Sequence, residues 1–128
     1  MPLRILLVED NADLRREVGE YLARRLHDVT PVGSSAEVRD LLSGDAEVEE
    51  IDLVLCDVNL QDGNGIELFA ELGPRRPACP WLLMSGDPDP QRLVDARRRN
   101  PTLPPCSIIA KPVSLRSLAA LIANMSDP

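Results

Sequence analysis

Carboxylate, hydroxyl and amine side chains directly follow four short apolar runs of this 128-residue sequence. They belong to Glu9, Asp10, Asp57, Ser85 and Lys111. If the runs are neighbouring strands of one parallel sheet, about 4.8 Å apart, these side chains meet at one edge. Three carboxylates in one crevice repel each other and raise at least one pKa, and a divalent cation with oxygen ligands relieves that repulsion. The pattern therefore predicts a Mg²⁺ site next to an ammonium group.

This set of groups suits the transfer of a phosphoryl group to a carboxylate. The negative charges of three carboxylates are balanced by one ammonium and one Mg²⁺, so an incoming phosphoryl group is not repelled. An ionised aspartate is a competent nucleophile, while the metal, the lysine and a hydroxyl stabilise the transferred oxygens. Lys111 is the only lysine among 14 basic residues, which indicates that a compact ammonium is needed there.

Five apolar runs, each followed by a stretch of helical periodicity, must position these groups. The expected strands are 5–8, 29–32, 53–56, 81–84 and 107–110. The expected helices carry their apolar positions within 14–22, 38–42, 66–72, 90–99 and 115–125, and 45–50 is expected to be a solvated loop. Five strand–helix units predict a doubly wound α/β fold with a five-stranded parallel sheet. Ligands of such sheets bind beyond the carboxyl ends of the strands.

The order of these motifs resembles a response-regulator receiver domain from Leu3 to about Met125. The resemblance rests on Glu9-Asp10, Asp57-Val58-Asn59-Leu60-Gln61-Asp62-Gly63-Asn64-Gly65, Ser85-Gly86 and Lys111-Pro112. It implies a single receiver domain over 1–128, with its core at about 3–125 and a flavodoxin-like (βα)5 fold. It also implies a phosphoprotein of a two-component system, a signalling domain rather than an enzyme, which promotes only its own phosphotransfer and dephosphorylation.

The resemblance assigns the acceptor and the metal ligands residue by residue. Asp57 matches the phospho-accepting aspartate, which also binds the metal. Glu9 and Asp10 match the acidic pair that holds Mg²⁺, and Asp10 is the expected direct ligand. Asn59 matches the position whose backbone carbonyl binds the metal.

The remaining assignments concern the phosphoryl group and its source. Ser85 matches the hydroxyl residue that hydrogen-bonds the phosphoryl group on activation. Lys111 matches the lysine that pairs with it, and Lys111-Pro112 matches a cis peptide bond in the family. The implied donor is a histidine kinase or a histidine phosphotransfer protein, and the implied result is a conformational switch that controls a downstream protein or output domain.

Three positions depart from the family pattern or modify it. Gln61 stands where a proline is common, and we expect this loop change to be harmless. Ile108, three residues before Lys111, stands where many receivers carry an aromatic ring that rotates with phosphorylation. Isoleucine cannot repeat that rotation, so we expect the readout, but not phosphorylation itself, to differ. Asp87, two residues after Ser85, is a position that can tune hydrolysis in the family.

Three other functions remain compatible with this fold class. A non-phosphorylated pseudo-receiver that acts as a protein-docking module is favoured by Ile108 but opposed by the complete acidic, hydroxyl and lysine set. An aspartate-nucleophile phosphatase typically carries D-x-D near the first strand, whereas the third strand here continues as Asp57-Val58-Asn59. A flavodoxin-like cofactor binder needs a phosphate-binding loop after the first strand, where Glu9-Asp10-Asn11 would repel a flavin phosphate.

The composition excludes several classes of function. With 14 basic and 21 acidic residues the net charge is −7, which disfavours binding to nucleic acid. No apolar run reaches the ~18–20 residues of a membrane span, and the amino terminus lacks a signal-peptide pattern. The distant Cys56, Cys79 and Cys106 are typical of buried thiols in a reducing compartment, so we expect a cytoplasmic location. Apolar residues on the outer face of the last helix could contact a partner, and a homodimer stays open.

Overall fold

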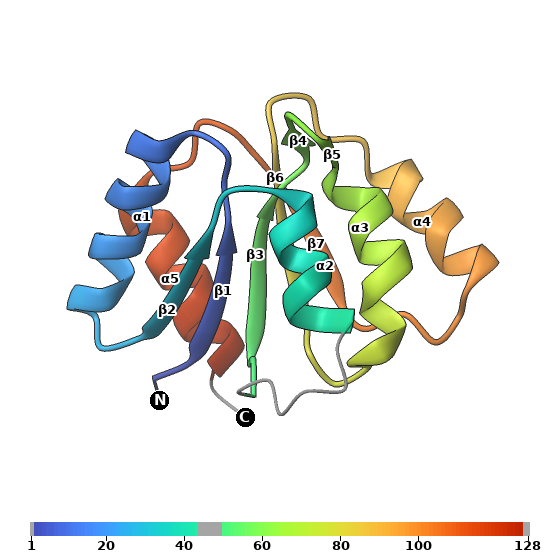
Figure 1. The fold of residues 1–128 in the computed structure, drawn as a ribbon, viewed down its shortest axis with the longest axis horizontal. Helices are drawn as coiled ribbons and strands as arrows, with labels where there is room; N and C mark the ends of the chain where they lie inside the picture. The colour runs from blue at the N-terminus through green and yellow to red at the C-terminus, as the bar shows by residue number, and fades with distance from the viewer. Residues whose placement is uncertain (1, 44–49, 127–128) are drawn as a thin grey trace.

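The computed structural model describes residues 2–43 and 50–126, so most of the loop expected at 45–50 lies outside the described residues. Five parallel strands form one sheet in the order β2-β1-β3-β6-β7 (Figure 1). Their bounds are β1 Arg4–Val8, β2 Asp28–Val32, β3 Leu53–Asp57, β6 Trp81–Ser85 and β7 Cys106–Ala110. The doubly wound, five-stranded parallel sheet predicted from the sequence is confirmed.

Helices cover both faces of the sheet (Figure 1). They are α1 Ala12–Arg24, α2 Ser35–Ser43, α3 Gly65–Leu72, α4 Pro90–Arg99 and α5 Leu115–Ser126. One face packs against α1 and α5, and the other packs against α2, α3 and α4. Alternate strand residues point to opposite faces, so Leu6 and Val54 enter one core while Leu7 and Leu55 enter the other. Apart from Arg4, Asp57 and Ser85 at their ends, the central strands β1, β3 and β6 are therefore apolar on both faces, which explains their continuous apolar runs.

Side-chain caps fix where several helices begin. Asn11 accepts a hydrogen bond from the Leu14 amide at 3.0 Å and caps α1. Asp89 accepts one from the Gln91 amide at 3.1 Å at the start of α4, where proline is the first helical residue. Such caps satisfy amides that have no partner within the helix. The caps thus fix the start of α1 after β1 and of α4 after β6, next to the carboxyl edge of the sheet.

A short hairpin after β3 is the element that the sequence pattern did not predict. Its strands, β4 Asn59–Leu60 and β5 Gly63–Asn64, pair antiparallel and lead directly into α3. A 3-10 turn, η1 Gly73–Arg75, follows α3. Strands of two residues are too short to show a periodicity, so only the turn-forming glycines of this segment are visible in the sequence.

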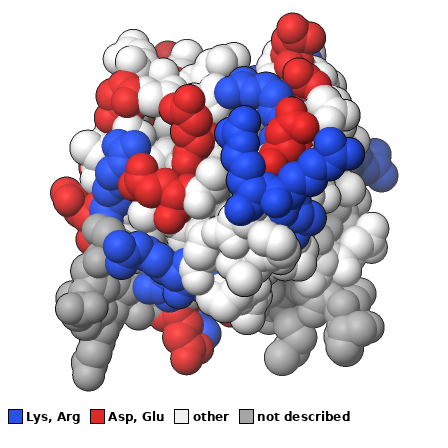
Figure 2. Space-filling model, turned by 90° about the vertical axis from the view of Figure 1, so that its right-hand side faces the viewer, with Lys and Arg blue, Asp and Glu red and all other residues white. Residues whose placement is uncertain are grey.

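Arginines gather with acidic residues on the side of the molecule formed by α3 and α4 (Figure 2). The basic run 97–99 forms the last turn of α4. Arg97, Arg98 and Arg99 are all exposed. The Arg97 guanidinium also donates hydrogen bonds of 2.8 Å each to the carbonyls of Leu103 and Pro104. It thereby fixes the loop that leads into β7.

The three cysteines are free thiols. Cys56 and Cys79 are buried, as predicted, whereas Cys106 is only half-buried because β7 is an edge strand. Trp81 is a core residue, 1% exposed, and its ring packs edge to face against that of Phe69 with 5.5 Å between the ring centroids. None of the helices in the described parts of the chain has the length and apolar character needed to cross a membrane.

Candidate functional site

The predicted site residues lie at the carboxyl edge of the sheet, around the end of β3. Asp57 is the last residue of β3, and Glu9 and Asp10 follow β1, which lies beside it. Ser85 ends β6 on the other side, and Lys111 follows β7. Parallel pairing brings these strand ends together, although Lys111 and Glu9 are 102 residues apart in sequence. The pattern of strand ends therefore predicted the location of the cluster.

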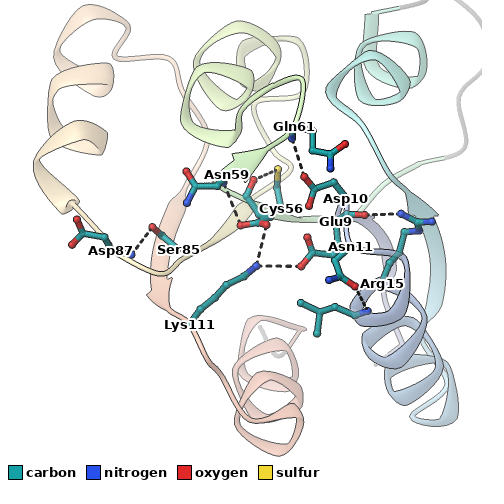
Figure 3. Close-up of polar contacts among 12 residues, drawn as sticks. Glu9, Asp10, Asn11, Arg15, Cys56, Asn59, Gln61, Ser85, Asp87 and Lys111 are labelled. Carbon is teal, nitrogen blue, oxygen red and sulfur yellow. Dashed lines mark hydrogen bonds and ion pairs between the residues drawn. The ribbon is translucent and has the colours of Figure 1, made fainter.

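Lys111 joins two buried carboxylates. Its Nζ lies 3.0 Å from Asp57 Oδ2 and 3.1 Å from Glu9 Oε1, and Figure 3 shows its side chain reaching across the end of the sheet toward Glu9. Asp57 is 5% exposed and Glu9 is 1% exposed. Burial lowers the pKa of Lys111, but the carboxylates of Asp57 and Glu9 outweigh that effect and raise it. The ammonium group is therefore held in its charged form.

The Glu9 carboxyl is buried beside Asp57 and Lys111. Burial, followed by the neighbouring Asp57 carboxyl, raises the pKa of Glu9 to about 6, and Lys111 opposes the shift. Glu9 Oε2 is buried and has no hydrogen-bond partner among the described residues. A buried carboxylate oxygen without a partner is costly unless something else binds it.

The donor set at this position fits a hard divalent cation. Glu9, Asp10 and Asp57 each offer one carboxylate oxygen, and these oxygens all lie within 4.8 Å of one another. Carboxylate oxygens together with water are the ligands that Mg²⁺ prefers. In the described part of the chain, no protein donor hydrogen-bonds the buried Oε2 of Glu9. The residues present therefore fit the cation that the sequence predicts.

The β4–β5 hairpin supplies backbone amides to two of the carboxylates. The Asn59 amide lies 3.3 Å from Asp57 Oδ1, and the Gln61 amide lies 2.8 Å from Asp10 Oδ2 (Figure 3). The contact with Asp10 was not predicted from the sequence, because a side-chain pattern does not reveal where a backbone amide points. The role expected for the Asn59 carbonyl stays a prediction.

Close packing behind Asp57 explains one glycine of the motif. A Cβ on Gly65 would lie 2.5 Å from the Asp57 carbonyl oxygen and 3.0 Å from the Val58 Cα. The Gly65 amide donates to the Val58 carbonyl at 2.8 Å. The hairpin can therefore fold back against the end of β3 only if this residue has no side chain.

Ser85 and Lys111 are also linked through their backbones. The Lys111 amide donates to the Ser85 carbonyl at 2.7 Å, and the Lys111-Pro112 peptide bond is cis, as predicted. Ser85 Oγ accepts a hydrogen bond from the Asp87 amide at 3.1 Å. Among the described residues, no hydrogen bond joins Ser85 to Asp57.

Ile108 is half-buried on β7 and packs against the core.

The structure is a three-layer α/β sandwich of the flavodoxin-like class. Its site, at the carboxyl edge of the sheet, contains carboxylates, a hydroxyl and one lysine. The sequence profile of the response regulator receiver domain matches residues 5–123. The chain therefore belongs to the response regulator receiver domain family, the receiver domains of two-component systems.

Individual relatives agree with this assignment. The chain is 30% identical to the response regulator protein FleR of Pseudomonas aeruginosa over 124 residues, which cover 97% of this chain and 24% of FleR. It is 26% identical to the phosphorylated cyanobacterial phytochrome response regulator RcpA, with a TM-score of 0.71 and coverage of 98% and 91% of the two chains. A CheY-like receiver domain protein from Methanospirillum hungatei JF-1 shares the fold, with 23% identity, a TM-score of 0.80 and coverage of 97% and 93%. The chain thus spans about a quarter of the length of FleR.

Proposed function

We propose that this domain accepts a phosphoryl group on Asp57 in the presence of Mg²⁺ and changes conformation to control a downstream protein. The observation that carries the proposal is the position of Lys111 Nζ, between the buried carboxylates of Asp57 and Glu9 at 3.0 and 3.1 Å. A lysine is held there at the cost of ordering its long side chain, and it lies where charge would develop on a transferred phosphoryl group.

Glu9, Asp10 and Asp57 would hold the cation, together with the backbone carbonyl of Asn59. When bound, Mg²⁺ would neutralise charge on the phosphoryl oxygens and help to orient them. Glu9 also holds the ammonium of Lys111 through Oε1, which leaves its buried Oε2 for the metal side of the site.

The reaction forms one bond and breaks one bond. A carboxylate oxygen of Asp57 attacks the phosphorus of a phosphohistidine, the phosphorus–nitrogen bond breaks, and the imidazole nitrogen keeps the electron pair of that bond. The product is an acyl phosphate on Asp57, which water later hydrolyses to aspartate and inorganic phosphate. Burial of Asp57 at 5% exposure limits the access of water to this bond.

Lys111 and Ser85 act on the phosphoryl oxygens after transfer. The Lys111 ammonium moves from carboxylate to phosphoryl oxygen over a short distance, because it already contacts Asp57. A hydroxyl can accept and donate at once, so Ser85 can keep the Asp87 amide and donate its own proton to the phosphoryl group. These new contacts bias the equilibrium between two conformations of the domain.

The proposed donor is a histidine kinase or a histidine phosphotransfer protein, and the proposed location is the cytoplasm, which the three free thiols support. FleR is about four times as long as the matched region, which supports an output region elsewhere in a longer protein; output through a separate partner is the alternative. The domain would act by phosphotransfer and its own dephosphorylation, not on a separate substrate.

Intact-mass analysis after incubation with acetyl phosphate tests the proposal. We expect a gain of one phosphoryl group that requires Mg²⁺, is lost in Asp57→Asn and is kept in Asp13→Asn, an exposed carboxylate of α1. If folded wild-type protein shows no adduct with or without Mg²⁺, the proposal is wrong and a docking role without phosphorylation is favoured.

A further inference from the structure

The turn of the β4–β5 hairpin touches the metal-binding carboxylates only through a backbone amide. The Gln61 amide donates to Asp10 Oδ2 at 2.8 Å, between segments that are 51 residues apart in sequence (Figure 3). The side chain of Gln61 is exposed, and the contact does not depend on its amide group. It depends only on the presence of a backbone N–H, which every residue except proline provides.

A second set of contacts fastens the same turn to the start of α2. The carboxylate of Asp62 accepts hydrogen bonds from the amides of Ser35, at 2.9 Å, and Ala36, at 3.2 Å. The hydroxyl of Ser35 donates to the Asp62 carbonyl at 3.1 Å. The Ser35 amide hydrogen bond is the main cause of the lowered pKa of Asp62. The turn is therefore held against the start of α2 through Asp62, while the amide of the preceding residue, Gln61, donates to Asp10.

We propose that Gln61 is a positioning residue for Mg²⁺ binding, because its backbone amide fixes the Asp10 carboxylate while Asp62 holds the hairpin against α2. This inference rests on the proposed function, since it concerns the same metal site. Proline, which is common at this position in the family, has no backbone N–H. The glutamine at position 61, a loop change that we expected to be harmless, therefore makes a contact with Asp10 that proline could not make.

The physical reason is the mobility of Asp10. Asp10 is only half-buried, whereas Glu9 and Asp57 are enclosed. A half-exposed carboxylate that rotates freely loses conformational entropy when it binds a cation. The hydrogen bond from the Gln61 amide to Oδ2 removes part of that freedom before the cation binds. Because the carboxylate is planar, fixing Oδ2 also restricts the position of Oδ1, which stays free to bind the cation. Pre-orientation of a ligand by a neighbouring hydrogen bond is a general way in which proteins raise metal affinity.

The test compares two substitutions at one position. Gln61→Pro removes the backbone donor, whereas Gln61→Ala keeps it and removes only the side chain. Mg²⁺ affinity is measured by titration calorimetry on the unphosphorylated protein, so that the readout does not depend on phosphotransfer. Partners of metal ligands contribute about 10–100-fold to affinity, so we expect Gln61→Pro to raise the Mg²⁺ Kd by about tenfold and Gln61→Ala by less than about twofold.

A second pair of variants separates positioning from loss of stability. Asp62→Ala removes the two hydrogen bonds that the Ser35 and Ala36 amides donate to this carboxylate at the start of α2. Asp89→Ala removes the side-chain cap of α4, which shares no hydrogen bond with the hairpin among the described residues. Both weaken a helix start, but only Asp62→Ala is expected to weaken Mg²⁺ binding, by about threefold or more.

The outcomes distinguish this inference from the proposed function. If the wild-type protein binds Mg²⁺ but Gln61→Pro matches Gln61→Ala and Asp62→Ala matches Asp89→Ala, the inference alone is wrong. If the wild-type protein binds no Mg²⁺, both the metal role of the site and the inference built on it are wrong.

Discussion

Substitution of Gly65 by alanine should destabilise the protein at the point where the hairpin meets β3. The added Cβ would lie 2.5 Å from the Asp57 carbonyl oxygen and 3.0 Å from the Val58 Cα. Both are backbone atoms, so no flexible side chain can move aside. Over-packing of this kind costs about 1–3 kcal/mol, and here the strand end that carries Asp57 must shift to relieve it.

Gly19→Ala is the matched control. Gly19 lies inside α1, and its added Cβ would meet only Leu7 Cδ2 at 3.8 Å, an ordinary contact. Alanine in a helix interior is favoured over glycine by about 0.5–1 kcal/mol. The two variants, which carry the same chemical change, should therefore differ in free energy of unfolding by about 1.5–4 kcal/mol, with opposite signs relative to wild type.

Urea unfolding followed by tryptophan fluorescence measures this difference, because Trp81 is the only tryptophan and is 1% exposed. Phosphorylation by acetyl phosphate, measured on the same samples at a urea-free condition where each is folded, should be slowed in Gly65→Ala and unchanged in Gly19→Ala. A Gly65→Ala protein as stable as wild type, with a normal phosphorylation rate, would refute the packing argument.

Three further predictions concern other contacts. Lys111→Arg should still be phosphorylated but should show a reduced change in amide NMR shifts, because a planar guanidinium does not replace a compact ammonium; a full-sized change would contradict this. Burial lowers the pKa of His27, whose Nδ1 accepts a hydrogen bond from the Leu3 amide at 3.0 Å. Below pH ~6.5 the folded state therefore binds fewer protons than the unfolded state. The contribution of His27 to the free energy of unfolding is present above pH ~6.5 and is lost as the pH falls. Urea unfolding at pH values on either side of this window should therefore show a larger acid loss in wild type than in His27→Asn, and equal losses would disprove it. Arg97→Ala should reduce the free energy of unfolding by about 1–2 kcal/mol through the loss of two hydrogen bonds to loop carbonyls, whereas Arg98→Ala should change it by less than about 0.5 kcal/mol; equal effects would show that the loop does not depend on Arg97.

The sheet could be predicted from the sequence because burial on both faces leaves continuous apolar runs, as in β3, where all five residues are buried. The edge strand β2 has a weaker apolar pattern because most of it is not buried, and Val32 is its one buried residue. The location of the site followed from the strand ends alone, because parallel pairing places Asp57, Glu9 and Lys111 together whatever the details of the loops.

The contacts between distant segments could not be predicted in this way. The amide of Gln61 on Asp10, and the carboxylate of Asp62 on the start of α2, depend on how a six-residue segment, 59–64, folds back over the sheet edge. A single sequence carries no periodic signal for such a segment. The expectation that the change at Gln61 is harmless concerns its side chain, whereas in the structure its backbone amide donates to Asp10.

The measurement that tests the central claim most directly is identification of the residue that carries the phosphoryl group. Protein incubated with acetyl phosphate and Mg²⁺ is treated with borohydride, which reduces an acyl phosphate to an alcohol, and peptides are then mapped by mass spectrometry. The account predicts conversion of Asp57 to homoserine, only in samples that contained Mg²⁺. Conversion at Glu9 or Asp10 instead, or an unmodified Asp57 in a sample whose intact mass includes a phosphoryl group, would contradict it.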